Sequence, residues 1–551
     1  IEPSVAVFVD GVYRSKTQSQ IADLPMLERV EVLRGPQSTL FGKNASAGVI
    51  NIVTKKPSFE KSGMITAGVG NYNSRIGKFY TTGPLNDTTA YSFSANFNNR
   101  DGHSDNPITG NATNNRDRFG IRAELLYVPS DDLSVRITAD FDEYDEICCA
   151  VGSTSYGTAN VVTALFGGQI IPNNPYTEKA FFDFDPISDG DNSGLSIYIE
   201  KNLDNFRIES ITSHRTSYNF ELQDVDFESV DQIDANNLIK DLEAVTQEIR
   251  LFSEDNERVN WLVGGYYYQE DMKYDNSIYF GSLWRSYIDA LVPGALAGVA
   301  AAFGVPNASL FAAGQGVKEV SAQDNVTKSI FAQFDVKVSD KLSALIGVSY
   351  IEDEKTVSIN QVNTDVFSNL DFVGLGTLGL IAAGFPPAQA AQLATDPSFN
   401  TLIPLQGIQF LPQFVNYPNI AQDGKSNDDN LDFTFKLSYL INDFTSIYGG
   451  ISTGYKATAW NISRDSLPDS IEIAALATAG TPVGPNTGVG RRYADPEESE
   501  VIELGAKILL PSGYLNLAIF DQKIEGFQSN TFVGTGFILA NAGSQSTEGF
   551  E

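Results

Sequence analysis

The stretch Tyr91-Ser-Phe-Ser-Ala-Asn-Phe-Asn98 alternates apolar and polar residues at every position. Successive side chains of a β-strand point to opposite faces, so this stretch predicts a strand with one apolar and one polar face. Residues 330–338 and 431–439 show the same alternation. The chain from residue 63 onward is therefore predicted to form repeated amphipathic strands. A soluble β-sandwich would share this pattern, so the connections between strands have to decide the architecture.

The connections alternate between short turns and long polar loops along the whole chain. Soluble sandwiches do not keep so strict an alternation, whereas bacterial outer-membrane barrels do, with short periplasmic turns and long outer loops. The sequence therefore predicts a mainly β fold, a large antiparallel transmembrane β-barrel of which roughly sixteen strands are present. The predicted short turns are residues 83–87, 129–132, 202–204, 254–257, 339–341, 441–443 and 510–512, and the predicted long loops are residues 101–117, 144–193, 219–243, 273–327, 355–429 and 456–497.

The composition fits a large β structure. The chain of 551 residues contains 23 tyrosines, 35 phenylalanines and 47 glycines, and 19% of its residues are charged. No uninterrupted apolar run reaches the roughly 18 residues that a transmembrane helix requires. Helices are predicted inside outer loops at residues 284–304 and 385–394. Prolines and glycines break the apolar run at residues 290–299, which favours a loop helix over a membrane span.

The chain is strongly acidic, with 69 acidic and 37 basic residues and a formal net charge of −32. This charge weighs against nucleic-acid partners, whose phosphates require basic patches. Two interpretations stay open: a solvated acidic surface, or a mouth that collects cations. Residues 185–191 lack the ligand pattern of an EF-hand, and calcium binding by an acidic outer loop is kept only as an alternative. No metal site and no cofactor are predicted.

Few residues offer catalytic chemistry. The chain has two histidines, His103 and His214, and no Ser-His-Asp or Cys-His arrangement can be assembled from them, so we do not expect an enzyme. The adjacent pair Cys148 and Cys149 lies in a predicted outer loop. Outside the cell a vicinal disulfide is favoured over metal binding, since no histidine or further cysteine is nearby.

Residues 1–62 do not show the repeated amphipathic strands that begin at residue 63. They predict a compact α/β domain, separate from a barrel at residues 63–551. Strands are predicted at residues 5–9 and 49–55, and Asp10-Gly11 is a tight-turn signal. Residues 27–33 alternate apolar and charged side chains, and Arg34-Gly35-Pro36 then forms a sharp break.

The stretch LERVEVLRGPQSTLFGKNASAGVINIVTKKP at residues 27–57 closely resembles the end of the plug domain in TonB-dependent outer-membrane receptors. Residues 10–13, 453–461, 496–505 and 541–551 also resemble segments of this family, so the resemblance reaches nearly from end to end. It implies an N-terminal α/β plug inside the barrel lumen. About twenty-two strands enclose a plugged lumen, whereas roughly sixteen strands with an unpaired edge do not close around one. We therefore expect a fragment that lacks the N-terminal part of the plug and the last barrel strands.

The resemblance also implies a function: active import of a scarce nutrient complex, above all a ferric siderophore, across the bacterial outer membrane. The implied partners are TonB with its inner-membrane energising complex, the ferric siderophore and outer-membrane lipid. The TonB-contact peptide of the family precedes the first residue of this sequence. An importer of cobalamin or a glycan would share the fold, and a surface-binding or adhesion receptor is an alternative of another class. A passive porin would lack the plug sequence.

Two groups of candidate site residues follow. The plug motif has two interpretations, because its charges and turns either hold the plug together or belong to the part that shifts when the importer is energised. Basic residues near the outer apex of the plug are predicted to face an anionic ferric chelate, and loop aromatics to contact an aromatic one, although such aromatics also pack against their own loops. The plug-motif residues are Glu28, Arg29, Glu31, Arg34, Gly35, Pro36, Gly42, Gly48 and Asn51, and the candidate ligand-binding residues are Tyr13, Arg14, Lys16, Trp284 and Tyr287.

Overall fold

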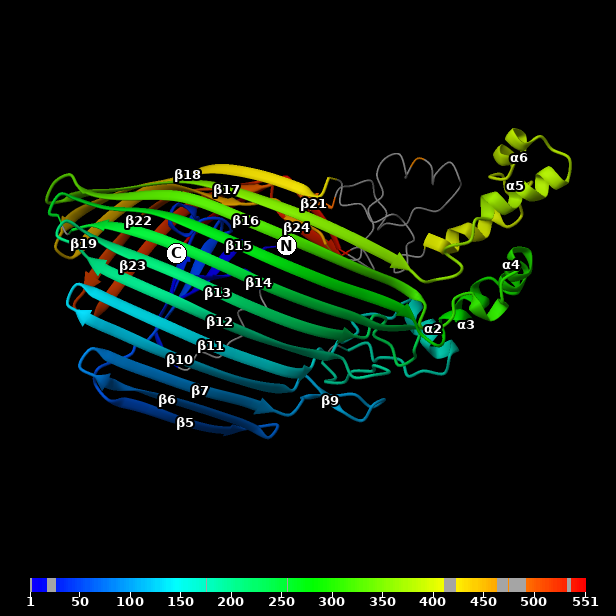
Figure 1. The fold of residues 1–551 in the computed structure, drawn as a ribbon, viewed down its shortest axis with the longest axis horizontal. Helices are drawn as coiled ribbons and strands as arrows, with labels where there is room; N and C mark the ends of the chain where they lie inside the picture. Colours follow the sequence, from blue (N-terminus) through cyan, green and yellow to red (C-terminus); the bar gives the residue numbers. More distant parts are fainter. Residues whose placement is uncertain are drawn as a thin grey trace.

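A computed structural model describes residues 2–16, 26–174, 176–254, 256–410, 423–462, 474, 492–532 and 537–551. Its dominant feature is one antiparallel sheet of 16 strands, in the order β26-β23-β22-β19-β18-β17-β16-β15-β14-β13-β12-β11-β10-β7-β6-β5. The sheet curves around a lumen, as Figure 1 shows. The mainly β barrel fold and the predicted number of strands in the chain are confirmed. Among the described residues, β5 and β26 are the two edges of the sheet.

The 16 wall strands are long, tilted and joined mostly to their neighbours in the sequence. Their bounds are β5 Ser62–Gly70, β6 Ser74–Asn86, β7 Thr89–Arg100, β10 Arg116–Ser130, β11 Leu133–Ile147, β12 Ile187–Asn202, β13 Phe206–Gln223, β14 Ile233–Ser253, β15 Val259–Phe280, β16 Gly316–Lys337, β17 Leu342–Asn363, β18 Lys425–Asn442, β19 Thr445–Lys456, β22 Glu497–Leu510, β23 Gly513–Glu525 and β26 Ser544–Phe550. Among the residues that the structure describes, three two-stranded ribbons lie outside this sheet: β8 Ser104–Asp105 with β9 Ala112–Thr113, β20 Ala459–Trp460 with β21 Tyr493–Ala494, and β24 Gln528–Phe532 with β25 Phe537–Asn541.

The connections follow the predicted alternation, but the strands run further into the outer loops than predicted. Residues 219–243 were expected to be a loop, whereas β13 continues to Gln223 and β14 already begins at Ile233. Those added residues pair in register across β13 and β14, from Ser217 opposite Leu242 to Gln223 opposite Asn236. Their polar side chains hid the strand in the sequence, because ladder hydrogen bonds use the backbone and do not require an apolar face.

The wall presents apolar side chains outward and polar ones inward. In β18, Leu431 and Phe433 are exposed on the outer side, while Asp432 between them is 1% exposed. The same inversion holds in β16, where Ile330 is 67% exposed and Ser329 is buried. A soluble protein places its apolar face inside, so this arrangement is typical of a barrel with an apolar surround and a polar lumen.

A separate four-stranded sheet occupies the lumen. Its strand order is β2-β1-β4-β3, with β1 Val5–Val9, β2 Val12–Arg14, β3 Leu27–Arg34 and β4 Gly48–Thr54, and the short helix α1 Ser38–Phe41 follows β3. The helix α1 contacts the wall strands β16, β17, β18 and β19. Figure 1 shows these N-terminal strands within the curve of the large sheet. The sheet ends at Thr54 and the wall begins at Ser62, while the division of the chain at residue 62 stays a prediction.

Helices project from the outer end of the barrel, beyond β15, β16 and β17 in Figure 1. The helix predicted at residues 284–304 is two helices bent by 104°, α3 Trp284–Leu291 and α4 Ala295–Phe303, because Pro293 and Gly294 separate them. The helix predicted at residues 385–394 is α6 Pro387–Leu393. The helix α5 Phe372–Ala382 was not predicted, since its three glycines lower helix propensity. The described residues also form α2 Thr158–Leu165, η2 Asn307–Ser309 and η3 Ile403–Phe410.

No single helix in the described part of the chain is long and apolar enough to cross a membrane; α3 and α4 reach that length and composition only as a bent pair.

Candidate functional site

The candidate site is the interface between the small inner sheet, which we call the plug sheet, and the barrel wall. Lys43, just after α1, is 6% exposed and its Nζ lies 2.7 Å from Oδ2 of Asp353 on β17. The same Nζ lies 3.7 Å from Oε1 of Glu2 and also donates to Asn325 of β16. Lys355 Nζ approaches the other oxygen of Asp353 at 2.5 Å. The plug sheet and the wall therefore share one buried network of alternating charges.

The charge network shifts the titration of the two plug residues in it. Burial raises the pKa of the Glu2 carboxyl, but the charges of Lys355 and Lys43 overcome this effect and hold that pKa well below its usual range. Burial lowers the pKa of the Lys43 ammonium group, but Asp353 and Glu2 outweigh it and leave that pKa raised. Both side chains are therefore charged at neutral pH, and each depends on the other for compensation.

A second anchor joins the turn of the first plug hairpin to the opposite part of the wall. Asp10, with φ of 51°, accepts hydrogen bonds from Thr54 N at 2.9 Å and Thr54 Oγ1 at 2.8 Å. Arg122 of β10 donates to Oδ2 of Asp10 at 2.5 Å, and its Nε binds Glu124 at 2.5 Å. The Asp10-Gly11 turn signal is thus also a contact with the wall.

The candidate ligand-binding residues of the plug lie against β15. Glu270 on that strand has no exposed surface and accepts hydrogen bonds from Ser15 and, at 2.5 Å, from Tyr268 Oη. Lys16 Nζ lies 3.6 Å from Oε1 of Glu270. Tyr13 is buried against the ring of Tyr268, with centroids 5.7 Å apart, and Asn44 donates to its hydroxyl group at 3.2 Å. Ligand contact by Tyr13, Arg14 and Lys16 stays a prediction, and in this structure all three contribute to the interface with the wall or lie buried beside it.

The plug motif divides into two groups. Four of its residues bond to one another on the plug sheet itself: Arg29 to Glu31 at 2.5 Å and to Glu28 at 3.5 Å, and Asn51 to Glu31 at 2.7 Å. Arg34, by contrast, reaches across to Glu551 at the end of the chain.

The turns of the motif bring the backbone of the plug sheet close to β19. Gly35 and Gly42 have φ of 71° and 74°, which glycine adopts without strain. A Cβ added to Gly454 of β19 would lie 2.7 Å from Cβ of Pro36, so only glycine permits this approach. Asn44 N donates to the Tyr455 carbonyl at 3.0 Å, and Ser499 of β22 donates to the Ser46 carbonyl at 2.7 Å. A set of short contacts therefore fixes residues 35–46 on the wall.

One side of the plug sheet is less tightly packed. A cavity of about 310 Å³ separates it from strands β10 to β14. The plug sheet contributes Asp10, Arg29 and Thr54 to the lining, and the wall contributes Arg136 and Glu209 among others. The arrangement therefore combines buried ion pairs to the wall with an open volume on one side of the plug sheet.

Trp284 and Tyr287 lie in an apolar core shared by several outer loops. Trp284 is 3% exposed, stacks on Phe280 at a centroid distance of 5.4 Å, and lies 5.6 Å from the ring of Tyr287. The residues of this core come from the outer ends of β14, β15 and β16, from the loop between β15 and β16, and from the loop between β17 and β18. The two aromatics thus pack among the loops, and a contact with ligand stays a prediction.

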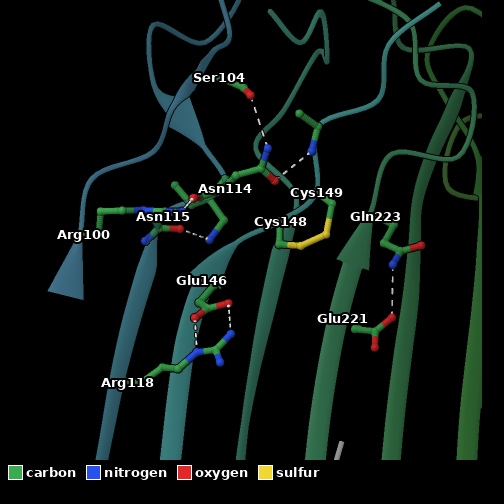
Figure 2. The surroundings of a disulfide bond; sticks show 12 residues. Arg100, Ser104, Asn114, Asn115, Arg118, Glu146, Cys148, Cys149, Glu221 and Gln223 are labelled. Atoms are coloured by element: carbon green, nitrogen blue, oxygen red, sulfur yellow. Dashed lines mark hydrogen bonds and ion pairs between the residues drawn. A yellow bond between two sulfur atoms is a disulfide. The ribbon is translucent and has the colours of Figure 1, made fainter. Parts of the chain in front are cut away.

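Figure 2 shows the surroundings of Cys148 and Cys149, which a disulfide joins directly after β11. Asn115 accepts a hydrogen bond from Ile147 N at 2.5 Å, and Asn114 accepts one from Ala150 N at 3.2 Å. Arg118 binds Glu146 through two hydrogen bonds of 2.6 and 3.0 Å. The polar groups of β10 and the loop before it therefore hold the chain on both sides of the cysteines. The disulfide in the expressed protein stays a prediction.

A group of carboxylates lies in the outer loops near Phe182. Burial, followed by repulsion from Asp231, raises the pKa of Asp183 to about 6. Burial also raises the pKa of Asp224 and of Asp226. Backbone amides of Phe227 and Ile233 donate to these two carboxylates at 2.8 and 2.7 Å. Among the described residues, no group of three or more His, Cys, Asp or Glu is arranged to hold a metal ion directly.

Sequence reasoning missed the charged residues that make the anchors: Glu2, Asp10, Lys43, Arg122, Glu270 and Asp353. A signal was present, since Asp353 and Lys355 occupy alternate positions of a strand and therefore share the lumen face. Lys43 could not be predicted as the plug-sheet partner of Asp353, because 310 residues separate the two in the sequence.

Comparisons with known proteins agree with this architecture. The family model described as TonB dependent receptor-like, beta-barrel, matches residues 150–551, and the model of the TonB-dependent receptor plug domain matches residues 2–49. The pesticin receptor of Yersinia pestis is 40% identical over 124 residues, 22% of this chain and 18% of that protein. The ferrioxamine B receptor of Salmonella typhimurium is 35% identical over 85 residues, 15% of this chain and 12% of that protein. Both alignments cover less than a fifth of the relatives.

Solved structures resemble the whole chain in fold. The ferric yersiniabactin uptake receptor FyuA from Yersinia pestis matches with a TM-score of 0.69 and 18% identity, covering 99% of this chain and 66% of that one. The siderophore receptor PiuA from Acinetobacter baumannii matches with a TM-score of 0.62 and 14% identity, covering 99% of this chain and 68% of that one. The chain thus spans about two thirds of the length of these solved receptors.

Proposed function

Because the chain belongs to the TonB-dependent receptor family, we propose that it imports a ferric siderophore across the bacterial outer membrane, powered by TonB. The observation that carries this proposal is the plug sheet held in the lumen by buried ion pairs to β10 and β17. A bulky ligand passes such a barrel only if the plug sheet moves. No ATP is available at the outer membrane, so the force comes from a partner that spans the periplasm.

The choice of cargo is supported by the relatives. The solved structure with the TM-score of 0.69 is named as a ferric yersiniabactin uptake receptor, and other relatives are named as siderophore or ferrioxamine receptors. The outward apolar band of the wall supports an outer-membrane location, because lipid favours apolar outward side chains. The long outer loops then face the outside of the cell and meet the ligand first.

The residues of the plug take two roles in this proposal. The anchors at Asp10 and Lys43 hold the resting plug sheet, and TonB has to break or bypass them. Ligand contact is proposed for Tyr13, Arg14 and Lys16 after a movement that uncovers them, and for Trp284 and Tyr287 after a rearrangement of the loops. Replacement of Arg14 and Lys16 by Ala is expected to weaken ferric-siderophore affinity, and unchanged affinity would remove both residues from the ligand site.

The deciding experiment is uptake by cells that express the full-length receptor. Iron-starved cells are given iron-55 complexes of a siderophore panel, with and without a proton ionophore. The expected result is accumulation of at least one complex that stops when the proton gradient collapses. Surface binding that the ionophore leaves unchanged, without accumulation, would identify a surface-binding receptor instead. Uptake of cobalamin or a glycan but of no iron complex would contradict the cargo and keep the transport class.

A further inference from the structure

The loop between β13 and β14, residues 224–232, lies between two longer outer loops, and we call it the linking loop. On one side it contacts the loop that carries α2, residues 148–186, which we call the α2 loop. Gln169 N of the α2 loop donates to Ser229 Oγ at 2.7 Å, and this hydroxyl group donates back to the Gln169 carbonyl at 2.9 Å. The two loops are therefore joined by a reciprocal pair of hydrogen bonds.

On its other side the linking loop contacts the loop that carries α3, residues 281–315, which we call the α3 loop. Ser282 N donates to Oδ2 of Asp231 at 2.7 Å, and Leu283 N donates to the Asp231 carbonyl at 2.9 Å. A Cβ added to Gly281 would lie 2.0 Å from Oδ1 of Asp231, so only glycine permits this approach. The linking loop thus connects the α2 loop to the α3 loop, and its conformation decides whether the two are held together.

Two carboxyl groups of the linking loop share a proton. Asp224 is 2% exposed, and a side-chain hydrogen bond joins it to Asp226. An ionised carboxylate only accepts hydrogen bonds, so a hydrogen bond between two carboxyl groups requires a proton on one of them. Phe227 N donates to Asp224 at 2.8 Å, and Ile233 N donates to Asp226 at 2.7 Å. The backbone around the linking loop therefore fixes the positions of both members of this pair.

The charged groups around the pair favour retention of the proton. Burial raises the pKa of Asp224, and the carboxylates of Asp226 and Asp183 raise it further. Asp183 belongs to the α2 loop, and burial raises its own pKa to about 6, with added repulsion from Asp231 and Asp234. Loss of the shared proton would place like charges side by side in a buried site, which is strongly unfavourable.

We propose that the linking loop is a pH-sensitive switch, closed while Asp224 and Asp226 share a proton and open once that proton is lost. With both carboxylates ionised, their repulsion is relieved when one of them turns toward water. Backbone amides of the same segment hold these carboxylates, so the movement also displaces Ser229 and Asp231, which contact the other two loops. Loss of the proton therefore releases the α2 loop and the α3 loop from each other.

The direction of the switch follows from the pKa shifts. A carboxyl group whose pKa is raised in the closed form stabilises that form while it is protonated, and this stability is lost as the pH rises through the raised value. The switch is therefore closed at low pH and open at high pH. Figure 1 places α2 and α3 at the same end of the barrel. An effect of the switch on ligand entry rests on the proposed function, whereas the movement of the loops does not.

The test is the distance between the two loops in the ligand-free, full-length receptor in detergent. Val161 of α2 and Leu291 of α3, both exposed, are replaced by p-azidophenylalanine, which accepts spin labels without reaction at the cysteines. Pulsed electron–electron double resonance is recorded at pH 5 and at pH 9. We expect a narrow distance distribution at pH 5 and a broader one, centred at a longer distance, at pH 9. The same distribution at both pH values would overturn the proposal.

Asp224→Asn separates the shared proton from a general effect of pH. The Asn side chain keeps an oxygen for Phe227 N and supplies a permanent N–H donor to Asp226, so we expect the distribution to stay narrow at pH 9. The matched control is Asp241→Asn, which changes an exposed carboxylate of β14 outside the linking loop and should leave the opening as in the wild type. Opening of Asp224→Asn to the wild-type extent would overturn the proposal. Loss of opening in Asp241→Asn would also overturn it, because the movement would then depend on general surface charge.

Discussion

Lys43 is a lysine with almost no exposed surface whose ammonium group touches both the plug sheet and the wall. Its neighbours Asp353 and Glu2 are as deeply buried, so each charge is stabilised chiefly by the others. A buried pair of this kind contributes little relative to an apolar pair, but loss of one partner leaves an uncompensated charge. Lys43 therefore matters to stability mainly because its removal leaves a buried carboxylate without a compensating charge.

Replacement of Lys43 by Met is expected to destabilise the docked plug sheet by about 3 kcal/mol, because Glu2 loses a partner while Lys355 still serves Asp353. Hydrogen exchange of residues 38–54 in the purified receptor measures the effect as lost protection. Lys55→Met is the control, since Lys55 is an exposed lysine on the same domain. Equal protection in the two variants would contradict a role of the buried network in docking.

At the scale of elements, the contact between the plug turn and β19 depends on the absence of a side chain. Gly454 faces Pro36, Ser46 and Ser499, with all three within 3.0 Å of an added Cβ. Strand β19 has its own ladder with β22 and does not need glycine there for its backbone. Gly454 is therefore needed because the plug turn approaches β19 closely, and not because the backbone of β19 requires a glycine.

Gly454→Ala is expected to lower stability by about 1–3 kcal/mol, the usual cost of overpacking, because an added methyl group would meet the ring of Pro36 and the backbone of Ser46, which do not yield. Thermal unfolding followed by tryptophan fluorescence checks this value. Gly513→Ala, in the open turn at the start of β23, meets nothing within 4 Å and should unfold as the wild type does. An unchanged melting temperature in Gly454→Ala would show that the plug turn is not held against β19.

The outer-loop carboxylates Asp183, Asp224 and Asp226 give a pH dependence with a definite sign. Each has a pKa raised by burial, Asp183 to about 6. A carboxyl with a raised pKa stabilises the folded loop while it is protonated, and this stability is lost as the pH rises through the raised value. Hydrogen exchange of the backbone amides of residues 224–233, corrected for the pH dependence of the intrinsic rates, should therefore be slower at pH 5 than at pH 8. Asp224→Asn should flatten the dependence, and a steeper profile in that variant would contradict the assignment.

For the whole molecule, the wall places apolar side chains outward and polar side chains toward a lumen that contains a second domain. The two faces are subject to different constraints. The outward face has to match lipid, whereas the inward face has to match the particular charges of the plug sheet. The strands continue beyond the apolar band, where charged residues such as Asp429 take the outward positions.

Phe435→Arg is expected to destabilise the barrel in the outer membrane by about 2–4 kcal/mol, because Phe435 lies outward in the apolar band of β18. Asn427→Arg places the same charge on the same face of the same strand, above that band, and should be tolerated. Heat-modifiable mobility on gels measures the folded fraction in isolated outer membranes. Similar losses in both variants would contradict the lipid-facing assignment.

The sequence by itself determined the β architecture, the positions of the short turns and the existence of the plug sheet. Alternation and turn chemistry are local properties, so Tyr91–Asn98 and Asp10-Gly11 carry them in a few adjacent residues. The extension of β13 and β14 into the outer loops was not predictable in this way, because their backbone ladder leaves no apolar signature. The helix α5 was missed for a related reason, since its glycines are offset by packing of Phe372 in the loop core.

Only the tertiary structure decided which lumen charges meet. Lys43, Asp353 and Glu2, or Asp10 and Arg122, are ordinary charged residues in the sequence, and nothing local distinguishes them from the many others in an acidic chain. Their pairing depends on how the plug sheet is rotated within the barrel, which is set by many contacts at once. Local pattern specifies elements, and long-range packing specifies sites.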